Sequence, residues 1–283
     1  LLKDHDRGVQ HRFVQDGLRL ACYRPFTKMH GYFDRVMNDM VYRMPTIFPT
    51  ANTPNIGFYQ VGNGSVVPFS VIATDALPDL HITCAGSGGQ FYPRYTYEPA
   101  AKRAETEALF EPTDADVFDG YRRIDNITDW ALGEYQREYG PQVSKDDIFF
   151  YVYGILHSPE YRERYAADLK KQLPRIPMVP GCERFEAFAE AGRRLSEIHI
   201  GYEQVEPHPL TETITVSAPS DPYERFAVTK MKYGGKAGAW DKTRIRYNNY
   251  INIEDIPEEV QRYMLGSRSA LDWIIERYQI KTD

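Results

Sequence analysis

The chain has 283 residues, of which 42% are hydrophobic and 26% are charged, and its formal net charge is −6. These values are typical of a globular protein that buries a substantial core, and they exclude a disordered tail. The length allows one large domain or two, and the acidic total argues at first against a polyanionic partner.

Short segments rich in β-branched and aromatic residues predict that residues 1–97 form mainly strands. Among them are PTIFP, NIGFYQV, VVPFSVIA and DLHITCA, which are separated by turn sequences such as TANTPN and AGSGGQ. VGNGS lies between NIGFYQ and VVPFSV, and its Asn-Gly pair accepts the positive φ angles of a tight turn. We therefore expect a β-hairpin at this position.

The character of the sequence changes after residue 97. Residues 98–127 are acidic and weakly patterned, which indicates a linker or a solvated insertion. Helices are predicted over residues 128–202, where CERFEAFAEAGRRLSEIHIGYE places apolar residues at a helical period.

Local start and stop signals mark the predicted helices. Thr128 is suited to cap the first helix and Gly140 to end it. Ser144 stands three residues before Asp147, an arrangement close to a capping box. Pro159 suits the first position of the next helix, PEYRERYAADLKKQ.

Strands are expected to return in residues 203–283, at TETITVSA, YERFAVTKMKY, TRIRYNN and YINIEDI, with a last helix at SRSALDWIIERYQI. The sequence therefore predicts an α+β fold with a strand-rich N-terminal part, a helical middle and a mixed β/α C-terminal part. These parts form either one domain, residues 1–283, or two subdomains.

The charges are distributed unevenly along the chain. Residues 98–147 carry 13 acidic and 6 basic residues, so this segment alone has a net charge of −7. Residues 19–43 carry five basic and two acidic residues, and residues 228–247 carry six basic residues and one acidic residue. A local basic surface, rather than the total charge, decides whether a protein binds phosphates. These two basic segments are therefore candidate polyanion surfaces.

Signatures of catalysis are missing from the sequence. It contains no GxxxxGK[ST] or GxGxxG phosphate loop and no HExxH or GxSxG motif. Its histidines and cysteines lack metal-ligand spacing, so no metal site is predicted. Asp79 and His81 lie close together, and a carboxylate–histidine pair can perform acid–base work. A solvent-facing Asp79 and a structural His81 are the favoured interpretation, and a self-contained hydrolase stays an alternative.

The strongest physical signal is KMKYGGKAGAWDKTRIRYNN, residues 230–249. In TRIRYNN, strand alternation places Arg244, Arg246 and Asn248 on one face. Arg can bond guanine bidentately, Asn can bond adenine bidentately, and both can hold phosphate. Lys236 lies in a Gly-rich loop that can approach a DNA backbone closely. Solvated charges on an exposed strand are the alternative, but the clustering favours a polyanion surface.

Cysteine usage bears on the compartment. Cys22, Cys84 and Cys182 are far apart and odd in number, so we expect reduced, buried thiols in a cytoplasmic protein. No apolar run approaches the roughly 18 residues of a membrane span, and the start of the chain has no signal-peptide pattern.

Six stretches in chain order carry a family resemblance: YRPFTKMHGYFDR, MPTIFPTANTPNIGF, LPDLHITCAGSGGQFYPRYTY, DIFFYVYGILHSPEYRERYAADLKKQLPRIP, FEAFAEAGRRLSEIHIGYE and WDKTRIRYNNYINIEDIPEEVQRYMLGSRSALDWIIERYQIKTD. Together they resemble the C-terminal specificity (target recognition) domain of type ISP restriction–modification enzymes. In these bacterial proteins one chain combines a nuclease, a helicase-type translocase, an N6-adenine methyltransferase and a target recognition domain. The chain begins at Leu1 and lacks their catalytic motifs, so we expect it to be a piece of such a protein.

The resemblance implies sequence-specific recognition of double-stranded DNA, with the target adenine positioned for an upstream methyltransferase and no chemistry in this chain. The implied partners are double-stranded DNA and the upstream methyltransferase and helicase domains, in the bacterial cytoplasm and without a membrane. No cofactor is expected in this chain, whereas the parent protein is implied to use S-adenosylmethionine, ATP and Mg²⁺. The alternative is a docking module whose helical middle binds other domains without DNA contact. It predicts that the two basic segments lie on separate faces.

We expect three groups of residues to contact DNA. They are Arg24, Lys28, His30 and Arg35 in the opening segment, Ser87, Gln90 and Arg94 around the Gly-rich turn, and Lys230, Lys232, Lys236, Lys242, Arg244, Arg246 and Asn248 in the late basic stretch. The family supplies no fixed motif for base contacts, so these choices rest on charge and hydrogen-bond chemistry.

Overall fold

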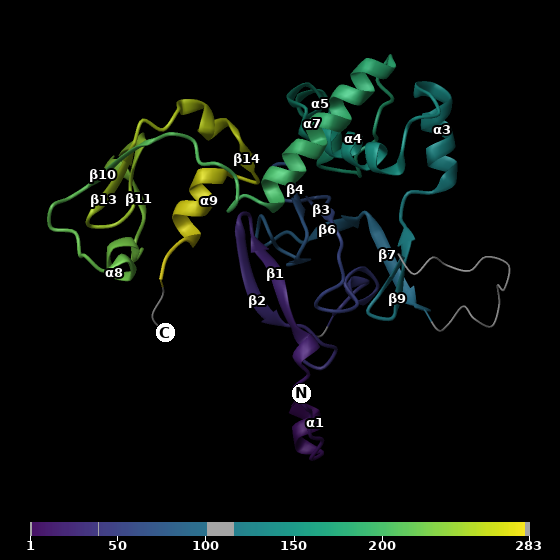
Figure 1. Cartoon of the computed structure of the whole chain (residues 1–283), viewed down its shortest axis with the longest axis horizontal. Coiled ribbons are helices and arrows are strands. Elements are labelled where there is room, and N and C mark those ends of the chain that lie inside the picture. Colours follow the sequence, from purple (N-terminus) through teal and green to yellow (C-terminus); the bar gives the residue numbers. More distant parts are fainter. Residues whose placement is uncertain (1, 39, 101–115, 281–283) are drawn as a thin grey trace.

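The computed structural model describes residues 2–38, 40–100 and 116–280. They form several small sheets together with a group of helices, so the predicted α+β class is confirmed. In Figure 1 the C-terminal sheet lies on one side of the molecule, and strands β7 (Tyr95–Pro99) and β9 (Tyr121–Asp125) lie on the opposite side. Strands β1 (Leu18–Arg24) and β2 (Thr27–Tyr32) lie between these two regions. Helices α4 (Lys145–His157) and α7 (Cys182–Ile200) lie above them in this view.

The central sheet has the order β4–β3–β6, formed by β4 (Val71–Thr74), β3 (Gly57–Val61) and β6 (Gly89–Pro93), and both pairings are antiparallel. Successive side chains of a strand point to opposite faces of a sheet. Accordingly, Phe58 and Ala73 pack in one core with the helices, while Tyr59 and Ile72 pack in a second core. The sheet is therefore buried on both faces.

Two further sheets flank the central one. In the first, β1 (Leu18–Arg24) pairs antiparallel with β2 (Thr27–Tyr32) and parallel with β5 (Leu77–Pro78). In the second, β9 (Tyr121–Asp125) lies between β7 (Tyr95–Pro99) and β8 (Val117–Phe118). Short helical segments α1 (Leu2–Asp6), η1 (Gln15–Gly17) and α2 (Met44–Ile47) belong to this N-terminal part.

The helical middle consists of α3 (Asp129–Tyr139), α4 (Lys145–His157), α5 (Pro159–Arg164), α6 (Ala166–Leu169) and α7 (Cys182–Ile200). Thr128 caps α3, Gly140 follows its last residue with φ 111°, and Ser144 and Asp147 form a capping box, as the sequence predicts. The predicted helix that begins at Pro159 is divided, because α5 ends one residue before Tyr165 and α6 begins after it.

The C-terminal part contains α8 (Pro222–Phe226), η4 (Glu258–Arg262), α9 (Ala270–Arg277) and the strand pair β14 (Met264–Leu265) and β15 (Arg268–Ser269). Its main sheet has the order β10–β13–β12–β11, with β10 (Thr211–Ile214), β13 (Ile251–Glu254), β12 (Ala239–Arg246) and β11 (Lys232–Lys236). Trp273 of α9 is buried in the core that contains Tyr59, so the last helix is anchored to the N-terminal part.

Several strand predictions are wrong. PTIFP lies largely in helix α2, where Pro45 suits the first turn, and YERF lies in α8. DLHITCA forms turns rather than a strand, because the Asp79 carboxylate accepts a hydrogen bond from the His81 backbone nitrogen at 2.7 Å. The hairpin between β3 and β4 is confirmed, and Gly64 in its connection has φ 74°.

Part of the predicted acidic linker or insertion, residues 101–115, lies outside the described residues. The remainder of residues 98–127 contributes to β7, β8 and β9. All three cysteines are free, but only Cys22 is buried, since Cys84 and Cys182 are half-buried. Within the described part of the chain, no helix is both long enough and apolar enough to cross a membrane.

Candidate nucleic-acid interface

The two faces of the C-terminal sheet differ sharply in chemistry. Tyr233, Ile245 and Ile253 align across β11, β12 and β13, and they pack in an apolar core with Val228 and Met231. The next row across the same strands is Lys232, Arg246 and Asn252. Because neighbouring positions of a strand alternate between faces, this polar row lies on the side away from the core.

We call the side chains of Lys232, Arg244, Arg246 and Asn252 the basic sheet face. Together with Glu254 they line a hollow of about 280 Å³. Three cations around a small hollow form a site that suits an anionic group such as a phosphate.

The cations of the basic sheet face are engaged to different degrees. Arg244 donates from Nε to Glu254 Oε1 at 2.9 Å, and this carboxylate raises the pKa of Arg244. Arg246 donates to the Asn248 carbonyl oxygen at 3.3 Å and to Asn249 Oδ1 at 3.1 Å. Among the described residues, the Lys232 ammonium has no hydrogen-bond or ion-pair partner. Lys232 is therefore ready to bind an anion, whereas Arg244 would have to leave Glu254.

Two residues of the late basic stretch lie elsewhere than strand alternation predicts. The register of β11 and β12 shifts between Tyr233 and Gly234, and this bulge turns Lys242 toward the core side. There, Lys242 Nζ lies 3.1 Å from Gln261 Oε1 and 5.1 Å from the Tyr233 ring. Lys242 does not share a face with Arg246.

Asn248 lies beyond the end of β12 and is only 6% exposed. Its Nδ2 donates to the carbonyl oxygens of Arg225 and Ala227, and its Oδ1 accepts from the backbone nitrogens of Tyr250 and Ile251. The side chain thus fixes the turn after β12, and it does not lie in a row with Arg244 and Arg246. Lys230 and Lys236, by contrast, are exposed.

The opening segment presents less positive charge than its sequence suggests. Arg24 Nη1 lies 3.5 Å from Asp79, and Lys28 Nζ lies 3.0 Å from Asp75 and 3.1 Å from the Ile200 carbonyl oxygen. These two cations connect β1 and β2 to neighbouring segments. His30 and Arg35 are exposed, so they are the candidates of this segment that reach solvent.

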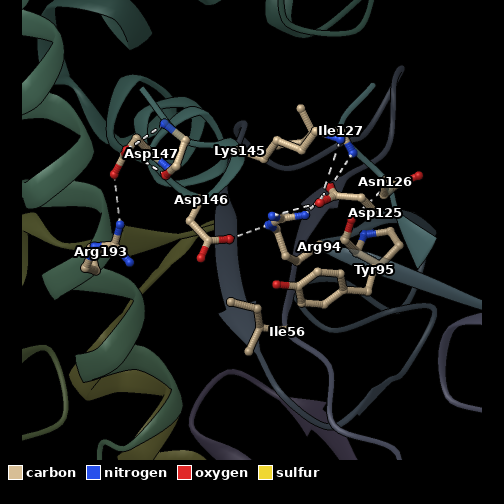
Figure 2. A network of polar contacts seen from close by, with 12 residues as sticks. Ile56, Arg94, Tyr95, Asp125, Asn126, Ile127, Lys145, Asp146, Asp147 and Arg193 are labelled. Carbon is tan, nitrogen blue, oxygen red and sulfur yellow. Dashed lines mark hydrogen bonds and ion pairs between the residues drawn. The ribbon is translucent and has the colours of Figure 1, made fainter. Parts of the chain in front are cut away.

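Arg94 is part of a polar network that joins three segments (Figure 2). The residue is 4% exposed, and its guanidinium donates from Nε to Asp146 at 2.7 Å and pairs with Asp125. Burial lowers the pKa of Arg94, but the two carboxylates outweigh burial and raise it above the ordinary value. Arg94 therefore connects the corner between β6 and β7 to the end of β9 and the start of α4.

A second hollow brings together amide side chains from distant parts of the chain. Arg43, Asn63, Gln90 and Asn126 line a cavity of about 820 Å³, and we call it the amide groove. Asn126 donates to the Pro93 carbonyl oxygen at 2.9 Å. Gln90 was expected from the sequence, and half-buried Ser87 lies nearby in the chain. The other three were missed, because nothing local links residues 43, 63 and 126.

An apolar cavity of about 770 Å³ adjoins the amide groove, since both are lined by Tyr42, Met44 and Phe91. Met29 and Met40 add to its lining, and both are exposed. We call this surface the methionine surface. Contiguous exposed apolar groups of this kind mark an interaction site more often than a free surface.

The described residues do not form the alternative acid–base pair of Asp79 and His81. Asp79 accepts from the His81 backbone and lies near Arg24, and no hydrogen bond joins its carboxylate to the His81 ring in the described part of the chain. No group of three or more His, Cys, Asp and Glu side chains is placed to hold a metal ion within the described ranges. This arrangement gives no support to a hydrolase that uses Asp79 and His81.

A histidine with a strongly lowered pKa, His199, lies in the core. His199 is buried, with Nδ1 2.5 Å from Tyr153 Oη and Nε2 2.9 Å from Tyr263 Oη. Burial, assisted by the charge of Arg162, lowers the pKa of His199 to about 4. This cluster joins α4 and α7 to the C-terminal part and is structural in character.

Comparison with known proteins places these surfaces in context. The family model described as the Type ISP C-terminal specificity domain matches residues 1–283. A comparison with curated proteins gave no match.

Solved structures of three larger proteins are similar to the chain. A nuclease-deletion mutant of the Type ISP restriction-modification enzyme LlaGI, in complex with a DNA substrate mimic, is 35% identical with a TM-score of 0.73, over 97% of this chain and 21% of that one. DrdV in its DNA complex is 32% identical with a TM-score of 0.80, over 100% of this chain and 26% of that one. The ATP-dependent Type ISP restriction-modification enzyme LlaBIII bound to DNA is 29% identical with a TM-score of 0.79, over 100% and 16%.

The chain thus spans only about a fifth of the length of these proteins. The family match over all 283 residues and the identity to LlaGI agree with each other. The chain therefore belongs to the family of Type ISP C-terminal specificity domains.

Proposed function

We propose that the chain recognises double-stranded DNA and supplies the sequence specificity of a larger restriction–modification enzyme. The basic sheet face carries this proposal, because it gathers Lys232, Arg244 and Arg246 around one small hollow in a chain of net charge −6. The similar structures of LlaGI, DrdV and LlaBIII were determined with DNA, which supports the same ligand here.

The two hollows suit different parts of a duplex. Arginine and lysine side chains around a phosphate hold a protein in register but carry little sequence information. Amide side chains can pair bidentately with an adenine edge, and arginine with a guanine edge. We therefore assign phosphate binding to the basic sheet face and base reading to the amide groove, with Gln90 and Arg43 as its leading residues.

The exposed cations outside these two surfaces extend the proposed interface. His30, Arg35, Lys230 and Lys236 are exposed, so they can reach a phosphate without breaking an internal contact. We assign a structural role to the candidates that hold protein partners and line neither hollow, which are Arg24, Lys28, Lys242, Arg94 and Asn248.

Within the larger enzyme, we propose that this chain positions the target adenine for a methyltransferase on the same polypeptide. The sequence carries no catalytic motif of its own, and the similar enzymes are about four to six times longer, since the match covers 16–26% of their chains. S-adenosylmethionine, ATP and Mg²⁺ would then be bound by those other parts in the bacterial cytoplasm.

A docking role has its own supporting observation, the methionine surface. The helical middle packs many of its apolar residues in one core, and Met29, Met40 and Tyr42 are exposed beside the 770 Å³ cavity. We propose that this surface contacts another domain of the larger enzyme, in addition to the DNA-binding role rather than instead of it.

A binding experiment with the 283-residue chain tests the main proposal. The probe is a pool of 30-base-pair duplexes with random sequence, titrated at several salt concentrations. We expect salt-sensitive binding, described by the slope of log K (the association constant) against log salt concentration, which we call the salt slope. The double variant K232A/R246A should reduce the magnitude of this slope by about 2. The double variant K171A/R184A removes one exposed lysine and one exposed arginine elsewhere and should leave the slope unchanged.

Two outcomes would contradict the proposal. The wild-type chain could fail to bind the duplex pool at 50 mM salt, or K232A/R246A could bind with the wild-type salt slope. Sequencing of the duplexes retained by the wild-type chain then identifies the recognised sequence, and Q90A should change it without changing the salt slope.

A further inference from the structure

The hairpin between β11 and β12 ends in a bare, glycine-bordered tip. Gly235 has φ 79° and Gly238 has φ 86°, and residues other than glycine rarely adopt this backbone conformation. Residues 235–240 are all exposed. The shape of this tip therefore depends on the positive φ angles of its glycines rather than on packing against the rest of the chain.

Trp240 stands on this tip with its indole largely uncovered. It lies opposite Gly235 across the two strands, and glycine has no side chain to cover the ring. The residue is 48% exposed, and no hydrogen bond or ring contact of Trp240 exists within the described ranges. Trp273 shows the usual arrangement, since it is 4% exposed and its Nε1 donates to the Leu265 carbonyl oxygen at 2.9 Å.

A free ammonium group lies at the same tip as Trp240. Lys236 is exposed there and has no ion-pair partner among the residues described. The neighbouring acidic residue is Asp241, whose Oδ1 accepts from the Thr243 backbone nitrogen at 3.0 Å and from its hydroxyl at 2.6 Å. An uncovered aromatic ring near a free ammonium group matches the chemistry of a nucleobase and its phosphate.

We propose that Trp240 stacks on a nucleobase of the DNA held by the basic sheet face. This inference rests on the proposed function and adds a specific contact to it. A two-stranded ribbon is narrow enough to enter a DNA groove, and aromatic or apolar side chains inserted between base steps unstack them. Lys232 and Arg246 would hold the backbone at the base of the hairpin while the indole contacts the bases at its tip.

The variants W240A and W240F test the inference in the full 283-residue chain with the same random duplex pool. W240A should weaken binding about tenfold, within the range for losing one base–aromatic stack, while the salt slope stays at the wild-type value. W240F should recover most of the affinity, because phenylalanine also offers a π-face. W130A is the matched control, since Trp130 on α3 is 75% exposed and lies outside the proposed interface.

Tryptophan fluorescence gives a second readout that does not depend on affinity. In a W130F background, saturating duplex should quench the emission of the chain, and the further change W240F should abolish the quenching. Wild-type affinity in W240A, together with quenching that persists in the W130F/W240F variant, would overturn the inference.

The failure of this inference is distinguishable from the failure of the proposed function. If K232A/R246A reduces the salt slope while Trp240 variants behave as wild type, DNA binding stands and the stacking contact is wrong. If the wild-type chain shows no salt-sensitive binding, both ideas are wrong.

Discussion

Gly154 of α4 lies directly against Gly192 of α7, so that a Cβ on Gly192 would stand 2.8 Å from the Gly154 nitrogen and 2.0 Å from the Phe150 carbonyl oxygen. The reciprocal Cβ on Gly154 would stand 2.3 Å from the Phe188 carbonyl oxygen. The two helix backbones therefore approach each other where neither residue has a side chain. This contact fixes α4 closely against α7.

The variant G192A should lower the free energy of unfolding. Overpacking costs about 1–3 kcal/mol, and a Cβ 2.0 Å from a backbone oxygen belongs at the upper end, which exceeds the gain of about 1 kcal/mol in helix propensity. The control is G133A in α3, where an added Cβ meets no atom within 4 Å. Urea unfolding should show destabilisation for G192A and stabilisation by about 0.5–1 kcal/mol for G133A. Equal stabilities of G192A and the wild type would contradict the close backbone contact.

The variant R94A should lower stability without changing DNA binding at temperatures where the chain is folded. Removal of the guanidinium leaves Asp125 and Asp146 without their buried partner, and we expect a loss of about 2 kcal/mol, because both carboxylates still reach water. Arg137, exposed on α3 and paired with Glu134, is the control, and R137A should change stability by less than about 0.5 kcal/mol. A changed salt slope for R94A would instead indicate that Arg94 contacts DNA.

The stability of the chain should fall as the pH decreases from about 6.5 to about 4. The pKa of His199 is about 4 in the folded chain, below the ordinary value of 6.5, so the unfolded chain binds the proton first. This one group accounts for up to roughly 3 kcal/mol, which is present above pH 6.5 and is lost toward pH 4.

Chemical denaturation at several pH values checks this prediction. The variant H199Q should have a flatter dependence over that interval than the wild type, whereas H208Q, at an exposed position, should keep the wild-type dependence. Parallel curves for the wild type and H199Q would show that His199 does not cause the loss.

The variant E254Q should strengthen DNA binding, provided that the proposed function is correct. Glu254 holds Arg244 in an ion pair, so its neutralisation frees a guanidinium for phosphate and removes a negative charge from the basic sheet face. The salt slope should increase in magnitude by about 1. The control E134Q removes a similar carboxylate from Arg137 on α3 and should leave binding unchanged. Weaker binding by E254Q would mean that Arg244 stabilises the sheet through Glu254 and does not bind DNA.

Local signals in the sequence predicted the helical middle well. Thr128, Ser144 and Asp147 act within a few residues of their own position, because a cap satisfies backbone groups in the first turn of its helix. The capping box at Ser269 and Asp272 follows the same rule. Such contacts depend on the nearby sequence, so they can be read from it.

Contacts between distant segments were not predictable in the same way. Arg24 and Lys28 are paired with Asp79 and Asp75, which are 55 and 47 residues away, and nothing in the opening segment identifies these partners. The bulge that turns Lys242 is likewise a property of two paired strands rather than of one. The sequence therefore indicated where positive charge is concentrated, but not which cations remain available to a ligand.

Polar and apolar side chains alternate along the strands of the C-terminal sheet, and this alternation determines which positions accept substitution. Lys232, Arg246 and Asn252 alternate in sequence with Tyr233, Ile245 and Ile253, so the polar outer row and the core packing come from different side chains of the same strands. Substitutions on the outer positions leave the inner layer intact. The charge of this sheet face can thus change by exchange of surface residues, without a new scaffold.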